Sequence, residues 1–198
     1  MSVAKPLVLM AASALSFSAL GDTGTFELRY RFNQPGGMPS EHEFLLKWTD
    51  SNSNLQTITV LQAEGGKVVQ TISVPQDRVQ LLWRDIVVGD KGTKDKIIDY
   101  VDYNFDQLGD IRLTQRWPYR TGQKMYLIWL YNEVENKYAL AEDLSRLPAP
   151  VADAKSGLIH STRLGAYAGG EFVSDTYSVE PDGGLILETR ISQTIKDP

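Results

Sequence analysis

The sequence predicts an all-β protein, either an antiparallel two-sheet sandwich or a small degenerate propeller, with one short helix. Apolar and polar residues alternate in many short runs, as in residues 25–32 (TFELRYRF), and this period of two is typical of a half-buried strand. Turn signals separate the runs at a spacing of roughly ten residues, which favours hairpins. No long helical pattern is present to cross between parallel strands, so an α/β fold is not expected.

The predicted strands follow one another along the chain with short connections. They cover about residues 25–32, 43–49, 56–62, 67–74, 79–88, 110–115, 124–131, 158–162, 171–179 and 185–191. Glycine, proline and asparagine mark the turns between them, because these residues favour tight reversals. One helix is predicted over residues 141–147, and Pro148 and Pro150 end it.

Residues 1–21 are predicted to be a secretory signal peptide. Lys5 supplies a positive charge before a mildly apolar run over residues 7–20, which ends in small residues at Ala19 and Gly21. This layout is typical of exported proteins, and the run is too short for a permanent membrane anchor. The alternative is an N-terminal strand or helix of the domain. With no repeat or linker in the rest of the chain, we expect a single domain over residues 22–198.

The predicted signal peptide and the composition together indicate that the mature chain resides in a soluble compartment outside the cytoplasm. The chain has 198 residues, a net charge of −5 and no cysteine. The absence of cysteine excludes disulfides and a lipid-modified cysteine anchor, so stability must come from packing or metal. The mild negative charge argues against nucleic-acid binding. We therefore expect a periplasmic protein that is not membrane-anchored.

The most informative segment is the acidic run over residues 102–110 (DYNFDQLGD). Asp102, Asn104, Asp106 and Asp110 place oxygen-bearing side chains at positions 1, 3, 5 and 9, and Leu108 can add a backbone carbonyl. Calcium prefers six to eight oxygen ligands of this kind. Three carboxylates so close together also repel one another unless a cation neutralises them. The segment therefore predicts a calcium-binding loop.

Two features distinguish this loop from the common calcium motifs. Position 6, where the backbone turns sharply and glycine is usual, is Gln107, and a left-handed residue there costs about 1 kcal/mol. Position 12 is Leu113 rather than glutamate, which excludes an EF-hand. The alternative is an acidic turn whose Asp and Asn side chains cap their own backbone.

Enzymatic activity is not expected. The two histidines are His42 and His160; His42, between two glutamates, is predicted to be exposed, and His160 to lie in a strand. No HExxH, GxSxG, P-loop or GxGxxG motif is present, and a cysteine nucleophile is impossible.

A binding surface has better support than an active site. Residues 161–170 (STRLGAYAGG) form a glycine-rich connection between two predicted strands. Arg163 and Tyr167 are residue types that anchor protein interfaces, and Gly165 allows the loop to protrude. The alternative is a loop whose tyrosine folds back onto the core.

Five segments in order resemble the periplasmic immunity proteins that inhibit lysozyme-like toxins delivered between Gram-negative bacteria by secretion systems. The resemblance covers about residues 99–190. The segments are Asp99-Tyr100-Val101-Asp102-Tyr103-Asn104-Phe105-Asp106 with Asp110-Ile111-Arg112-Leu113, then Leu127-Ile128-Trp129-Leu130-Tyr131-Asn132, Leu144-Ser145-Arg146-Leu147-Pro148, Ser161-Thr162-Arg163-Leu164-Gly165-Ala166 and Gly183-Gly184-Leu185-Ile186-Leu187.

The resemblance implies an all-β inhibitor that blocks the cleft of a peptidoglycan hydrolase, with calcium supporting the fold or the interface. Related lysozyme inhibitors present a Ser-Gly-rich loop ending in tyrosine. The nearest match here is Leu164-Gly165-Ala166-Tyr167, which lacks the serine and is shorter. The alternative function is a secreted, calcium-stabilised binding module for a glycan or a surface protein.

Overall fold

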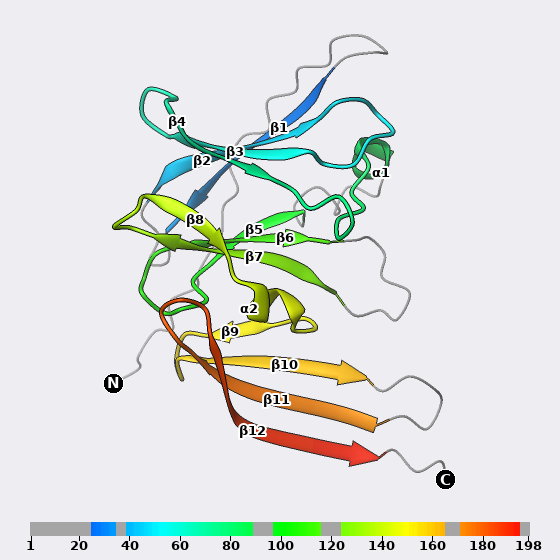
Figure 1. The fold of residues 1–198 in the computed structure, drawn as a ribbon, viewed down its shortest axis with the longest axis vertical. Helices are drawn as coiled ribbons and strands as arrows, with labels where there is room; N and C mark the ends of the chain where they lie inside the picture. Colours follow the sequence, from blue (N-terminus) through cyan, green and yellow to red (C-terminus); the bar gives the residue numbers. More distant parts are fainter. Residues whose placement is uncertain (1–24, 35–38, 89–96, 116–123, 165–170, 195–198) are drawn as a thin grey trace, which may run out of the picture.

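The computed structural model describes residues 25–34, 39–88, 97–115, 124–164 and 171–194. These residues form three four-stranded antiparallel sheets stacked as successive layers (Figure 1). The predicted all-β, antiparallel class is confirmed, and the stack has one sheet more than a two-sheet sandwich. The elements are β1 (Phe26–Asn33), β2 (Pro39–Trp48), β3 (Thr57–Gln62), β4 (Val68–Ser73), α1 (Trp83–Val88), β5 (Ile98–Val101), β6 (Asp110–Thr114), β7 (Tyr126–Asn132), β8 (Lys137–Leu140), α2 (Glu142–Arg146), β9 (Val151–Asp153), β10 (Leu158–Leu164), β11 (Glu171–Val179) and β12 (Leu185–Thr194).

Each sheet is a meander of four strands consecutive in the chain: β1 to β4 form the first sheet, β5 to β8 the central sheet and β9 to β12 the third sheet. In the first sheet, Leu28, Leu46 and Ile58 lie opposite one another on β1, β2 and β3, and all three are buried. The alternating residues point to solvent. The period of two in the sequence thus corresponds to one buried face.

The central sheet is buried on both faces. Leu127 and Trp129 of β7 lie in the first core, between the first and central sheets. Their neighbours Ile128 and Leu130 lie in the second core, between the central and third sheets. A strand covered on both sides requires apolar residues at successive positions, which explains the unbroken apolar run of β7.

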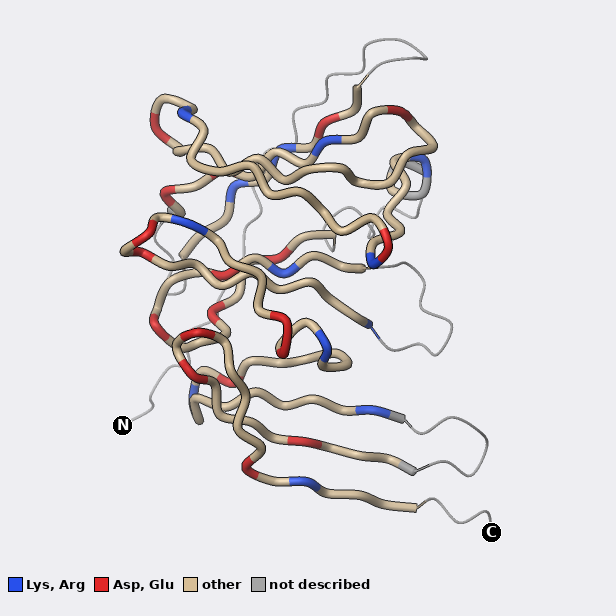
Figure 2. The backbone as a smooth tube through the Cα atoms, in the orientation of Figure 1, with Lys and Arg blue, Asp and Glu red and all other residues tan. Residues whose placement is uncertain are grey.

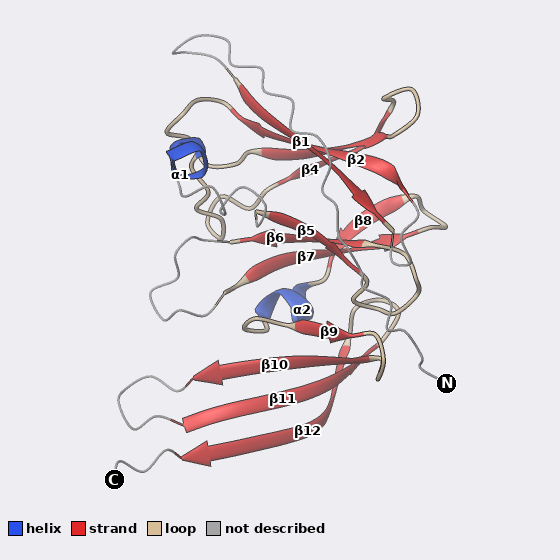
Figure 3. Cartoon of the chain, turned by 180° about the vertical axis from the view of Figure 1, so that it is seen from behind, coloured by secondary structure: helices blue, strands red, loops and turns tan. Residues whose placement is uncertain are grey.

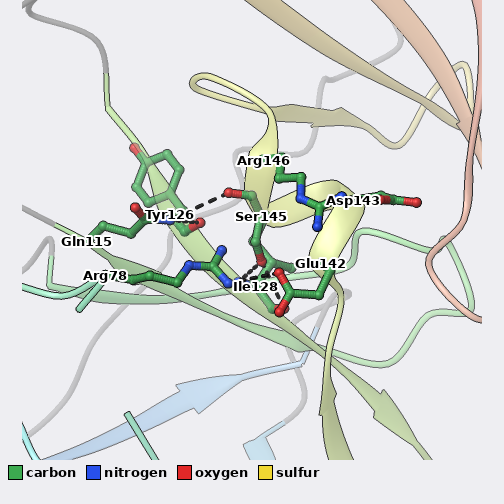
Figure 4. Close-up of polar contacts among 8 residues, drawn as sticks. All are labelled: Arg78, Gln115, Tyr126, Ile128, Glu142, Asp143, Ser145 and Arg146. Atoms are coloured by element: carbon green, nitrogen blue, oxygen red, sulfur yellow. Dashed lines mark hydrogen bonds and ion pairs between the residues drawn. The ribbon is translucent and has the colours of Figure 1, made fainter. Parts of the chain in front are cut away.

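Helix α2 confirms the predicted helix and packs on the second-core side of β7. Leu144 belongs to that core, and the buried Ser145 Oγ accepts a 2.9 Å hydrogen bond from the backbone N–H of Ile128 (Figure 4). Arg78 Nη1 donates to Glu142 Oε2 at 2.8 Å. A buried hydrogen bond from the Ile128 backbone to the Ser145 side chain therefore attaches the helix to the central sheet, and an exposed ion pair attaches it to Arg78.

Helix α1 occupies part of a segment for which the sequence predicted a strand over residues 79–88, so that prediction was wrong. Trp83 and Ile86 are three residues apart, share one helix face and are both buried in the first core. The Trp83 ring stacks on Phe26 at 4.9 Å and meets Trp48 edge-on at 5.3 Å. This packing overrides the strand propensity of the valine-rich end.

His42 is also placed differently from the expected exposed position. β2 begins earlier than predicted, so Ser40 and His42 share the inward face with Phe44. His42 is 6% exposed, and its Nδ1 lies 3.1 Å from the Tyr138 hydroxyl of β8. Burial lowers the pKa of His42, because the charged form loses its hydration.

The third sheet covers the second core with only part of its inner face. Ile159 of β10 is buried there, and Tyr177 and Leu185 pack against it. The other ends of β10 to β12 extend away from α2 (Figure 3), and β12 is exposed along nearly its whole length. In the described parts of the chain, no helix has the length and apolar character needed to cross a membrane.

Candidate functional site

The predicted calcium loop connects β5 to β6 at one end of the central sheet. Two non-glycine residues of the loop have positive φ angles: Phe105 at 60° and Gln107 at 71°. The sharp turn expected at position 6 is therefore present. Each left-handed residue costs on the order of 1 kcal/mol. Phe105 packs against the second core, which offsets part of this cost.

The loop is held by hydrogen bonds between its own side chains and backbone. Asp102 Oδ2 accepts from the N–H of Gln107 at 2.9 Å, and Asp106 Oδ1 accepts from the N–H of Leu108 at 2.8 Å. Asn104 Nδ2 donates to Asp106 Oδ2 at 2.9 Å. These bonds are the self-capping that the alternative interpretation of the segment requires, and they set the loop's shape without a metal.

Asp110 has a different role from the other acids of the loop. It is 0% exposed, and each carboxylate oxygen accepts a backbone hydrogen bond: from Tyr103 at 2.7 Å and from Tyr131 at 2.9 Å. Burial raises the pKa of Asp110 to about 7, although these two bonds oppose the shift. Asp110 therefore fastens the start of the loop to the end of β7.

Asp102 carries the one oxygen in this loop that is buried and has no hydrogen-bond partner, Oδ1. Burial raises the pKa of Asp102, and the nearby charge of Asp106 raises it further. An orphaned carboxylate oxygen is costly in a protein interior. A cation or a water molecule at Oδ1 would remove that cost.

The donor atoms of the loop fit calcium in type, because all are oxygens. Their arrangement fits less closely: among the described residues no three His, Cys, Asp or Glu side chains are grouped as a metal site requires. Asn104 presents its amide nitrogen to Asp106. Binding would require that amide to turn its oxygen inward and the Asp102 and Asp106 carboxylates to converge.

Of the three predicted partner-binding residues, the structure describes Arg163. Arg163 is exposed near the end of β10, opposite Val173 of β11. Gly165 and Tyr167 lie outside the described residues. The structure therefore places one of the three predicted residues, near the end of β10.

A charged cluster beside Arg163 escaped the sequence analysis. Arg190 of β12 binds Asp175 of β11 through two bonds, Nε to Oδ1 at 2.6 Å and Nη2 to Oδ2 at 2.9 Å. The Tyr177 hydroxyl donates to the same carboxylate at 3.1 Å. The Arg190 bonds hold the pKa of Asp175 below its usual value, and the charge of Arg163 lowers it further. Figure 2 shows the acidic position between basic positions on the neighbouring strands.

The sequence contained only part of the signal needed to predict this cluster. Asp175 and Arg190 are direct cross-strand partners in the β11–β12 hairpin, and opposite charges at such positions attract. Counting back from the turn at residues 181–184 would pair them only if the bulge at Thr176/Tyr177 were known. A single residue of register shift moves the arginine to the other face.

Comparison with protein-family models, with curated proteins and with solved structures finds no match for this chain.

Proposed function

We propose that this chain is a periplasmic immunity protein that binds and inhibits a lysozyme-like peptidoglycan hydrolase toxin. The observation that carries the proposal is the position of Arg163. It is an exposed guanidinium near the end of β10, and the adjacent strand β11 is joined to β12 by the Asp175–Arg190 pair. Together with the segment order that resembles such inhibitors, it supports a function in binding, with no catalysis by this chain.

The inhibitor would act by presenting the β10–β11 connection to the cleft of the hydrolase. Asp175 is neutralised by Arg190, so the charge of Arg163 is left to attract an acidic partner. Catalytic carboxylates of muramidases are such groups, and arginine can bind a carboxylate through two parallel hydrogen bonds. We propose that Gly165 and Tyr167 of this chain also contact the hydrolase.

Replacing Arg163 with alanine is expected to weaken inhibition at least about tenfold, because a desolvated charge pair in an interface is worth more than about 1.4 kcal/mol. The melting temperature should not change, since the side chain is exposed. Inhibition constants against the captured hydrolase measure the effect. Arg146→Ala is the matched control, because its side chain is 72% exposed and belongs to α2. Equal inhibition by both variants would place the interface elsewhere.

The hydrolase can be identified by a pull-down with tagged protein (residues 22–198) in calcium and again in chelator, followed by mass spectrometry. Capture of a peptidoglycan hydrolase supports the proposal. Retention of a glycan or a surface protein without any hydrolase would instead support the alternative binding module.

We further propose that the loop over residues 102–110 binds one calcium ion. Its ligands would be side-chain oxygens of Asp102, Asn104, Asp106 and Asp110 and the backbone carbonyl of Leu108. The buried, unpartnered Oδ1 of Asp102 supports this assignment. A bound cation would also reduce the repulsion that raises the pKa of Asp102 and Asp110.

Chelation is expected to lower the melting temperature by about 5 °C, because removing a ligand held at 100 times its Kd costs about 2.7 kcal/mol. Differential scanning calorimetry in calcium and in EDTA measures the shift. Asp102→Asn should abolish the shift, whereas Asp77→Asn, an exposed acid outside the loop, should retain it. Identical melting curves for the unmodified protein in both buffers would contradict the proposal that the loop binds calcium.

A further inference from the structure

The imidazole of His42 is enclosed between the first and the central sheet. It belongs to β2 and is 6% exposed. The ring meets two tyrosine rings of the central sheet edge-on, with its centroid 5.2 Å from that of Tyr131 on β7 and 5.7 Å from that of Tyr138 on β8. Figure 1 shows β8 next to the first sheet at this edge. A titratable group therefore lies between two of the three layers.

The hydrogen-bond partners of His42 suit a neutral ring. Its Nδ1 lies 3.1 Å from the Tyr138 hydroxyl, which is also hydrogen-bonded to the hydroxyl of Tyr100 on β5. The side chain of Asn136, in the turn between β7 and β8, makes a further hydrogen bond with His42. A neutral imidazole can accept the Tyr138 proton at Nδ1, whereas a protonated imidazole can only donate. Protonation therefore places two donors against each other.

The groups around the ring do not compensate a positive charge on it. Burial is the largest influence on the pKa of His42 and lowers it, and the charge of Glu41 on β2 only partly opposes this shift. The tyrosines that face the ring from β5, β7 and β8 have pKa values raised above the usual 10, so they stay neutral in mild acid. Glu43 lies on the outer face of β2 and accepts a 3.0 Å hydrogen bond from Arg29 Nη1.

Tyr138 joins the two sheets through its backbone as well as its ring. Gln70 of β4 donates from Nε2 to the Tyr138 carbonyl at 2.9 Å, and Gln70 Oε1 accepts from the Tyr138 N–H at 2.8 Å. The ring of Phe44 on β2 meets the Tyr138 ring edge-on at 5.7 Å. A displacement of the Tyr138 ring therefore acts directly on the contacts that β8 makes with β2 and β4.

We propose that His42 and Tyr138 form an acid-sensitive latch, which opens the contact of β8 with β2 and β4 when His42 takes up a proton. The neutral ring accepts the Tyr138 hydroxyl and keeps the two sheets together at this edge. The charged ring loses that acceptor role and gains hydration by turning toward water. The Tyr138 backbone then separates from Gln70.

The direction of the pH dependence follows from the lowered pKa. In the open latch the ring is hydrated and has the ordinary histidine pKa of 6.5. Below pH 6.5, and until the pH falls through the lowered pKa of the closed latch, the open form binds more protons than the closed form. Acid therefore favours opening, and the latch is closed at neutral pH.

Hydrogen–deuterium exchange of the full-length chain from about pH 7.5 to about pH 5 tests the latch at the Tyr138 N–H, which the closed form protects through Gln70. After correction for the intrinsic exchange rate, we expect the protection of this amide to fall at least about threefold. His42→Gln should make the protection independent of pH. His160→Gln is the matched control and should retain the loss, because the other histidine lies on β10 with Nδ1 3.2 Å from Thr176 Oγ1.

Asp110 also titrates in this range, because burial raises its pKa to about 7. It is unchanged in both histidine variants, so the difference between His42→Gln and His160→Gln isolates the latch. Constant protection in the unmodified protein, or an equal loss in His42→Gln, would overturn the inference.

A nuclear magnetic resonance titration of the unmodified protein tests the same inference without a substitution, and it decides the matter if circular dichroism shows that His42→Gln does not fold. We expect a His42 pKa below 6.5 and a change in the Tyr138 N–H resonance with the same midpoint. A His42 pKa of 6.5 or above, or a Tyr138 resonance that does not follow it, would contradict the latch.

Discussion

Replacing Gly109 with alanine is expected to lower the free energy of unfolding by about 3 kcal/mol, the upper end of the range for overpacking a core. A Cβ at this position would lie 1.9 Å from Tyr100 Cε1 and 2.1 Å from Cζ. The ring of Tyr100 cannot move aside easily, because it is buried and stacks on Phe32 at 5.6 Å. Urea unfolding followed by tryptophan fluorescence measures the loss.

Two further variants separate the clash from other effects of adding a methyl group. At Gly66 a Cβ would meet nothing within 4 Å, although φ is +65°, so Gly66→Ala should cost only about 1 kcal/mol of backbone strain. Tyr100→Leu removes the atoms that the new methyl group meets. In that background Gly109→Ala should cost much less, and equal costs in both backgrounds would show that the close approach is not the cause.

Replacing Asp110 with alanine is expected to cost about 4 kcal/mol, measured in EDTA so that calcium contributes nothing. The substitution leaves the backbone N–H groups of Tyr103 and Tyr131 without their acceptor. A hydrogen bond to a charged group is worth about 1.5–3 kcal/mol, and a buried donor without a partner keeps its full desolvation cost. The same urea titration gives the value.

Asp110→Asn should cost roughly half as much, because the amide keeps one acceptor oxygen of nearly the same shape. Asp106→Ala is the control from the same loop: Asp106 is exposed and its Oδ1 accepts the Leu108 N–H at 2.8 Å, so we expect a loss of no more than about 1 kcal/mol. A loss for Asp110→Ala as small as that of Asp106→Ala would remove its anchoring role.

The acidic loop could be predicted from the sequence, but the different roles of its acidic residues could not. Spacing alone placed Asp102, Asn104 and Asp106 in a tight turn, and the left-handed Gln107 is present as expected. The same spacing treated Asp110 as one more ligand. Its burial and its bond to Tyr131 depend on how β7 packs beside β6, which no local pattern encodes.

Strand prediction succeeded for the longer strands, including β7, which is buried on both faces. It missed β5, β8 and β9, which have four, four and three residues, because such short segments show too few alternations to detect. In β2 the pattern extended back to His42, whose inward position is in phase with Phe44 and Leu46. The inward position of His42 was not predicted, because histidine is polar and does not continue the apolar pattern.

The sequence by itself determined the all-β class, the hairpin connections, the helix before Pro148 and the acidic loop, because each depends on neighbours within a few residues. Only the tertiary structure decided that the strands form three sheets, that β7 is buried on both faces, and that residues 83–88 are helical. It also decided that Asp175 pairs with Arg190 and that Asp110 joins Tyr103 to Tyr131. These outcomes depend on contacts between residues distant in the chain, such as the 21 positions between Asp110 and Tyr131, and packing of that range overrides local preference.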